Sequence, residues 1–164
     1  MKTATEALLD GLLHECEQAR VVIESIQKAK MDFIPAKGMR DLITVANHLA
    51  QIPSMDPAIY CMELDCSERA HEMEERLRRD TVSGLLEVFD AGVEEVRRRF
   101  SRMTDKELFE RNKKPFYDQG PPKDWAFYLS EMTRHIAMHK MQLWMYLRLQ
   151  GLPVTMMTYY GVKT

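Results

Sequence analysis

The sequence predicts an all-α protein built as a four-helix bundle. Four long segments carry apolar residues at every third or fourth position, and loops rich in proline or glycine separate them. No segment shows the strict alternation of apolar and polar residues that is typical of a β-strand. The chain of 164 residues has no internal repeat and no low-complexity segment. We therefore expect one domain over residues 1–164 with a single core.

The first expected helix covers residues 3–30, with Thr3 or Thr5 as its cap. Its apolar stripe consists of Leu8, Leu12, Cys16, Ala19, Ile23 and Ile26. Pro35 and Gly38 then interrupt the pattern. A connecting loop is expected there.

The second expected helix covers residues 39–52 and ends before Pro53, because a proline disfavours helical geometry in the residue that precedes it. Its inward stripe consists of Leu42, Val45, Ala46 and Leu49. His48 lies at the edge of this stripe. Residues 53–67 contain two prolines and mixed polarity, so we expect a loop.

A short, highly charged helix is expected over residues 67–79, between the second and third long helices. The third long helix follows, with Asp80 or Thr81 as its cap. Its apolar face consists of Leu85, Phe89, Val93, Val96, Phe100 and Met103. Glutamates and arginines occupy its other faces, as expected for a bundle helix.

The connection to the fourth long helix begins with a short helical turn, since Thr104 and Glu107 have the spacing of a capping box. Residues 113–123 are rich in proline and glycine and form a loop. The fourth long helix covers residues 125–151 and is apolar on nearly every side. We expect it in the middle of the bundle or at a contact between subunits. The tail after Pro153 has no clear period and is expected to be extended.

Charge and composition exclude several classes of protein. A net charge of -2 argues against a nucleic-acid-binding protein, which normally needs a basic surface. The basic clusters at residues 76–79 and 97–99 lie among glutamates, so we expect solvated, salt-bridged faces. No apolar run approaches the ~18 residues of a membrane span, and the N-terminal segment lacks the apolar core of a signal peptide. Cys16, Cys61 and Cys66 form no disulfide or zinc-binding pattern. A cytoplasmic location is expected.

Three of the five histidines are candidate metal ligands. His135 and His139 are four residues apart, so both imidazoles lie on one helix face about one turn apart. If the second and fourth helices pack side by side, His48 can join them at one ion and leave an open position, as in catalytic metal sites. The same spacing also arises by chance, and hydrogen-bonded core histidines would fit the pattern too. His14 and His71 lie among charged residues and are expected at the surface.

Three other polar residues of the fourth helix are candidates for supporting roles. Gln142 and Arg148 lie on an otherwise apolar helix, so each needs a partner if it is buried. Gln142 is expected to orient a ligand histidine, and Arg148 to pair with a carboxylate for structural reasons. Glu131, four residues before His135, is a weaker candidate for a base. No catalytic residue is assigned.

The order and spacing of these residues resemble the DinB superfamily, which includes YfiT-like metal-dependent hydrolases. The resemblance covers nearly the whole chain. It is strongest in the second helix, with GMRDLITVANHLAQ containing His48, and from His135 to Gly161, where HxxxH precedes the tail HKMQLWMYLRLQGLPVTMMTYYG. Gln142, the YLR segment, Gly151 and the pair Tyr160-Gly161 belong to the same pattern.

The resemblance implies an up-down-down-up four-helix bundle, often a homodimer, that binds one divalent metal ion. Carried over to this chain, the ligands are His48, His135 and His139. Zinc and nickel are the leading candidates, although the sequence does not choose between first-row ions. Superfamily members include transferases and isomerases that use a low-molecular-weight thiol such as bacillithiol, mycothiol or glutathione. The resemblance thus implies an S-transferase that acts on a small electrophile. The alternatives are a metal-dependent hydrolase and a non-catalytic dimeric stress-response or binding protein.

Overall fold

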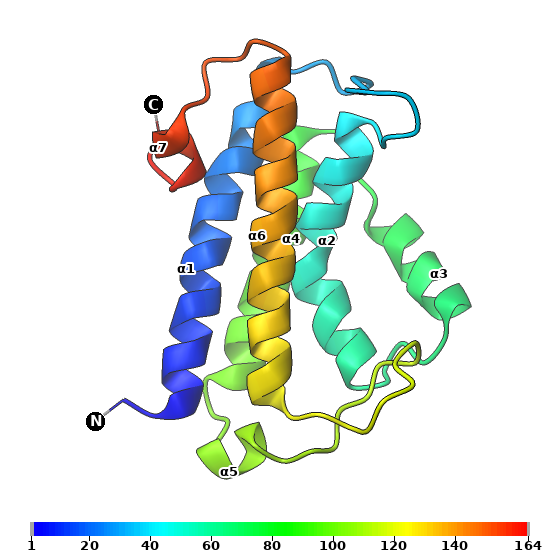
Figure 1. Ribbon diagram of the computed structural model, residues 1–164, viewed down its shortest axis with the longest axis vertical. Coiled ribbons are helices and arrows are strands. Elements are labelled where there is room, and N and C mark those ends of the chain that lie inside the picture. The colour runs from blue at the N-terminus through cyan, green and yellow to red at the C-terminus, as the bar shows by residue number, and fades with distance from the viewer. Residues whose placement is uncertain (1, 164) are drawn as a thin grey trace.

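The computed structural model describes residues 2–163, and its long helices form a four-helix bundle (Figure 1). These helices are α1 (Ala4–Glu24), α2 (Leu42–Tyr60), α4 (Val82–Phe100) and α6 (Trp125–Leu149). Both α1 and α2 pack against α4 and α6, so the four helices close around one core. Over residues 2–163 the chain forms no β-strand, only an isolated bridge between Lys113 and Lys123. The predicted all-α bundle is confirmed.

The helix directions follow the predicted up-down-down-up order. In Figure 1, α1 and α6 run upward, while α2 and α4 run downward. Because α2 and α4 point the same way, the chain must return along the bundle between them. The short helix α3 (Ser67–Leu77) makes this return on the outside of α2. None of its residues is fully buried.

Each long helix begins at a residue whose side chain accepts a hydrogen bond from a backbone N–H of the first turn. Thr3 caps α1 and forms a capping box with Glu6. Asp41, Thr81 and Asp124 cap α2, α4 and α6. The predicted capping box at Thr104 is also present and begins α5 (Asp105–Leu108). A 3₁₀ turn, η1 (Ser25–Lys28), extends α1 to nearly its predicted end.

The predicted end of the second helix was wrong, because α2 continues through Pro53 and Pro57 to Tyr60. Each proline removes one backbone donor, which normally kinks or ends a helix. Here tertiary packing outweighs that loss. A Cβ atom on Gly92 of α4 would lie 3.0 Å from the Cβ of Pro53 and 2.6 Å from Ser54 Oγ, so the two helices touch closely at this glycine. Most residues of the added turns are buried.

The C-terminal tail was expected to be extended, but it contains a short helix, α7 (Met156–Tyr159). Thr155 caps this helix, and Trp144 Nε1 donates a hydrogen bond to the Thr155 carbonyl oxygen at 2.9 Å. Arg148 Nη1 donates to the Val154 carbonyl oxygen at 3.1 Å. Arg148 therefore has the expected structural role, with a backbone carbonyl in place of the expected carboxylate.

A buried lysine joins α1, α6 and α7. Lys140 is only 1% exposed, and its Nζ lies 2.7 Å from Glu15 Oε1 and 2.6 Å from Gln18 Oε1. The same ammonium group lies 3.9 Å from the centre of the Tyr159 ring, within the range of a cation–π interaction. Because all three partners come from the chain itself, we assign Lys140 a structural role. Within the described chain, no helix has both the length and the hydropathy that crossing a bilayer needs.

Candidate metal centre

The packing of α2 against α6 brings the three predicted histidines together. One ring nitrogen from each of His48, His135 and His139 lies within 4.8 Å of the others. The Nε2 atoms of His48 and His135 are 3.2 Å apart, and the three ring centres are separated by 4.4, 5.0 and 5.2 Å. All three side chains are half-buried. The predicted meeting of these rings is confirmed, whereas their binding of a metal stays a prediction.

Two hydrogen bonds fix which nitrogen of each α6 histidine is available. His135 Nδ1 lies 2.9 Å from Asp56 Oδ2, and His139 Nδ1 lies 2.9 Å from Gln142 Oε1. A carboxylate or amide oxygen can only accept, so both Nδ1 atoms carry the hydrogen and donate it. The Nε2 atom of each ring therefore keeps its lone pair, as a metal ligand requires. Gln142 orients the ring of His139, as predicted.

Asp56 is the site residue that the sequence analysis missed. It is 6% exposed and also accepts a hydrogen bond from Tyr60 Oη at 3.1 Å. It had been assigned to a loop, because α2 was expected to end before Pro53. Once α2 continues, the eight-residue separation from His48 places Asp56 about two turns further along the same side of the helix. That spacing was the only signal in the sequence.

Burial keeps two of the imidazoles neutral at ordinary pH. It lowers the pKa of His48 to about 3, with smaller contributions from His139 and His135. Burial also lowers the pKa of His139. Neutral imidazole is the form that binds metal ions.

The spacing of His48 and His135 fits a first-row divalent ion. Two nitrogens that each bind one ion at about 2.1 Å lie roughly 2.9–3.4 Å apart, depending on the coordination angle. The 3.2 Å between His48 Nε2 and His135 Nε2 falls in that range. Since His135 Nε2 carries no hydrogen, a proton on His48 Nε2 or a cation must lie between the two atoms. Three imidazoles, two of them oriented by hydrogen bonds, are a donor set that suits zinc, nickel and related ions.

His48 lies between two hollows. One, of about 140 Å³, is bounded by Asp56, Ile59, Tyr117 and His135. The other, of about 260 Å³, lies between α2 and α3. Burial raises the pKa of Tyr117 to about 12, so its hydroxyl remains a hydrogen-bond donor at neutral pH. Both hollows are also lined by Gln51 and Glu74, so a small molecule has room beside His48.

The remaining predicted residues lie outside this cluster. Glu131 forms an ion pair with Arg134 on the exposed side of α6, and no contact brings it to the histidines. His14 and His71 are exposed, as expected.

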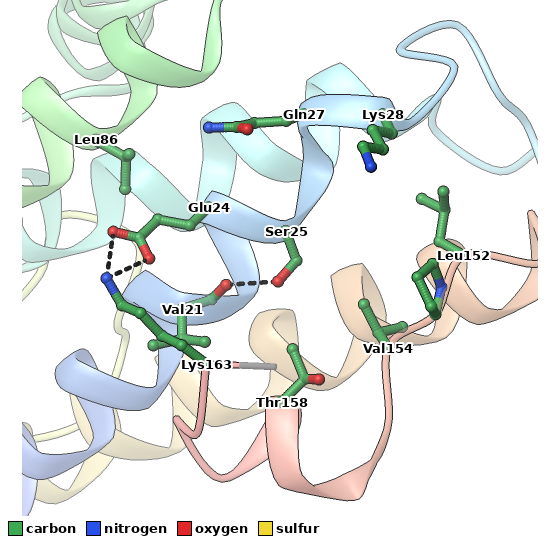
Figure 2. A pocket seen from close by; sticks show the side chains of 11 residues that line it. Val21, Glu24, Ser25, Gln27, Lys28, Leu86, Leu152, Val154, Thr158 and Lys163 are labelled. Atoms are coloured by element: carbon green, nitrogen blue, oxygen red, sulfur yellow. Dashed lines mark hydrogen bonds and ion pairs between the residues drawn. The ribbon is translucent and has the colours of Figure 1, made fainter.

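A larger hollow, of about 460 Å³, is lined by none of the candidate ligands (Figure 2). It lies between the end of α1 and the C-terminal segment, where Lys163 Nζ pairs with Glu24 Oε2 at 2.9 Å. Ser25 Oγ donates to the Val21 carbonyl oxygen at 2.8 Å in the same wall. Because these polar groups find partners within the chain, the histidine cluster remains the candidate functional site.

Comparison with known proteins bears on the fold. No protein-family model and no curated protein matches the sequence. A solved structure from Exiguobacterium sibiricum, described as a putative member of the DinB family, superposes with a TM-score of 0.74. The match covers 94% of this chain and 97% of that chain, with 22% sequence identity. The predicted resemblance to DinB proteins is therefore confirmed at the level of the fold.

Proposed function

We propose that the protein is a DinB-like metalloprotein that binds one divalent ion through His48, His135 and His139. The observation that carries this proposal is the convergence of three imidazoles whose α6 members have Nδ1 engaged and Nε2 free. Zinc and nickel are the ions that we propose, since both accept several imidazole ligands.

We further propose that the site transfers a low-molecular-weight thiol to a small electrophile. A divalent ion bound there would lower the pKa of a thiol and keep the thiolate in place. Asp56 and Gln142 hold the rings of His135 and His139 in their orientation, which supports a preorganised site. The hollows beside His48 supply space for the thiol and the electrophile.

Metal analysis tests the first proposal. Protein purified without a histidine tag should contain about one divalent ion per chain, as measured by inductively coupled plasma mass spectrometry. The variant His139→Ala should lose most of it, whereas His71→Ala, which removes an exposed histidine, should retain it. Equal metal content in His139→Ala and the unmodified protein would contradict the proposal.

A thiol panel tests the second proposal. Metal-loaded protein is assayed with small electrophiles in the presence of bacillithiol, mycothiol or glutathione. Turnover that needs both metal and thiol supports a transferase. Turnover of activated esters without thiol would replace it with a hydrolase, and no turnover in either assay would leave a metal-binding protein without catalysis.

We also propose that the protein forms a homodimer through an exposed apolar stripe on α6. Four large side chains on one side of the helix are 39–59% exposed: Met138, Met141, Met145 and Leu149. An apolar stripe of this length on a helix surface is typical of a contact between subunits. Light scattering should show that Met145→Glu yields a monomer, while Met157→Glu, on α7, remains a dimer. A monomeric unmodified protein would overturn this proposal.

A further inference from the structure

The hollow between α2 and α3 borders the candidate metal centre directly. It has a volume of about 260 Å³, and His48 forms part of its wall. The other wall residues are polar or charged: Arg40, Thr44, Asn47, Gln51, Glu74 and Arg78, with Glu75 beside them. A molecule in this hollow would lie against the His48 ring.

Buried side chains of α2 hold the hollow open at a fixed width. Asn47 is 4% exposed; its Nδ2 donates to the carbonyl oxygens of Ile43 and Arg79, and its Oδ1 accepts from the Arg79 backbone N–H. Gln51 is 5% exposed, and its Nε2 donates to the Glu74 carbonyl oxygen at 2.9 Å. Asn47 and Gln51 flank His48 in the sequence, so α3 is positioned by the same part of α2 that carries the candidate ligand.

Two arginines of this hollow form no ion pair. Among the described residues, no Asp or Glu lies within ion-pair distance of Arg40 or Arg78, whereas Arg98 pairs with Glu95 and Arg99 pairs with Glu63 and Glu95. Asp41 is the carboxylate that Arg78 influences: hydrogen bonds from Thr44 and, more weakly, the charge of Arg78 lower the pKa of its carboxyl.

The expectation that Arg76, Arg78 and Arg79 form salt bridges is wrong, because none of the three lies within ion-pair distance of a described carboxylate. Arg79 Nη1 donates instead to the carbonyl oxygens of Arg76 and Arg78.

The acidic residues of the same wall restrict what these arginines can bind. Glu74 and Glu75 place negative charge in the hollow, so a dianion such as phosphate would be repelled. A single carboxylate can pair with a guanidinium in a planar, two-bond geometry. A monocarboxylate, with or without an amino group, carries the single negative charge that one of these guanidinium groups can pair with.

We propose that this hollow binds the carboxylate of a small substrate whose other end reaches the ion at His48, His135 and His139. Only the contact with the ion rests on the proposed metal site; the binding of the carboxylate does not. Arg40 and Arg78 would hold the carboxylate, and the substrate would extend along the His48 ring.

A series of three small thiols tests the proposal in cobalt-loaded protein. 3-Mercaptopropionate, 2-mercaptoethanol and cysteamine have a similar reach but carry a carboxylate, a hydroxyl and an ammonium group. Titration of the thiolate-to-cobalt absorption band should show that 3-mercaptopropionate binds about fivefold more tightly than 2-mercaptoethanol, as expected for a partly exposed charge pair. Arg40→Gln should reduce the ratio to about one. The matched control Arg97→Gln, which removes an equal charge on α4, should leave it unchanged.

A second measurement does not depend on metal. In the metal-free protein, propionate but not propanol should shift the amide NMR signals of Thr44, Asn47 and Gln51, and Arg40→Gln should remove these shifts. If cobalt does not bind but the shifts appear, the metal site fails and the carboxylate site stands. If cobalt and thiols bind without a carboxylate preference, or propionate causes no shifts that depend on Arg40, the carboxylate proposal is overturned.

Discussion

Two neighbouring residues of α6 show opposite uses of a polar side chain. Lys140 is buried between α1 and α7, where a carboxylate, an amide oxygen and an aromatic ring of the chain surround its ammonium group. His139 faces α2 and has one nitrogen bound by Gln142, while its other nitrogen lies among the other two histidines. Every named partner of the Lys140 ammonium group belongs to the chain. For His139, the chain supplies a hydrogen-bond partner for Nδ1 only. The first arrangement stabilises the fold, and the second leaves a lone pair for a ligand from outside.

The largest effect should come from removing Lys140, whose named partners all belong to the chain. Lys140→Ala should lower the free energy of unfolding by about 3–5 kcal/mol, because it leaves Glu15 and Gln18 without their buried partner and opens a void. His139→Ala in the metal-free protein should cost about 1 kcal/mol or less. Urea denaturation measures both. The exposed Lys163→Ala serves as a control, with a cost below about 1 kcal/mol. Similar losses for Lys140→Ala and His139→Ala would remove the contrast.

The histidine site depends on α2 remaining helical past Pro53, because Asp56 lies in that part of the helix. The second-largest effect on stability is therefore expected at Gly92, where α4 touches α2 closely. Gly92→Ala should lower the free energy of unfolding by about 1–3 kcal/mol, because the added methyl group would overlap Pro53 Cβ and the Oγ and backbone N atoms of Ser54. Gly11→Ala is the matched control, since nothing lies within 4 Å of its Cβ position. It should be neutral or stabilise the protein by about 0.5–1 kcal/mol. Thermal or urea unfolding separates the two cases.

A substitution at Asp56 separates metal affinity from stability, because it leaves all three candidate ligands in place. Asp56→Asn should weaken metal binding about 10- to 100-fold, because the neutral amide holds and polarises His135 less well. The stability of the metal-free protein should change little, since the amide still fills the same space. Competition with a chelator measures the affinity, and Asp90→Asn on α4 provides a control. Unchanged affinity would show that Asp56 does not support the site.

The smallest effect is expected at a partly buried polar contact between α1 and α5. Asp105 accepts hydrogen bonds from the backbone N–H groups of Thr5 and Ala4, which lower its pKa below the ordinary value of 3.8. Its contribution to stability is therefore present above pH 3.8 and is lost as the pH falls through the lower, folded-state pKa. The difference in unfolding free energy between the unmodified protein and Asp105→Asn should be constant near pH 7 and shrink below pH 3.8. A difference that grows on acidification would contradict this.

Local patterns in the sequence predicted most of the bundle. Apolar periodicity predicted the four long helices. The cap of α1 was narrowed to Thr3 or Thr5 and that of α4 to Asp80 or Thr81, of which Thr3 and Thr81 are the observed caps. The spacing of His135 and His139 predicted a shared helix face. These features depend on neighbours within one or two turns. The convergence with His48 depended on two helices packing side by side, and the resemblance to DinB proteins supplied that step.

What the sequence did not predict depends on contacts between distant segments. The extension of α2 requires Gly92, about forty residues away, to accept Pro53 against its backbone. Asp56 was missed for that reason. The role of Arg78 depends on where α3 lies against α2, which hydrogen bonds of Asn47 and Gln51 decide. Neither is visible in a local pattern.

The position of α3 has a consequence for how this protein could evolve. The helix contributes no fully buried residue to the bundle, yet it forms one wall of the hollow beside His48. Mutations at Glu74, Glu75 or Arg78 can therefore accumulate without disturbing the folding of the main core. One scaffold with an unchanged set of histidines could in this way give rise to descendants that differ in the small molecules they select.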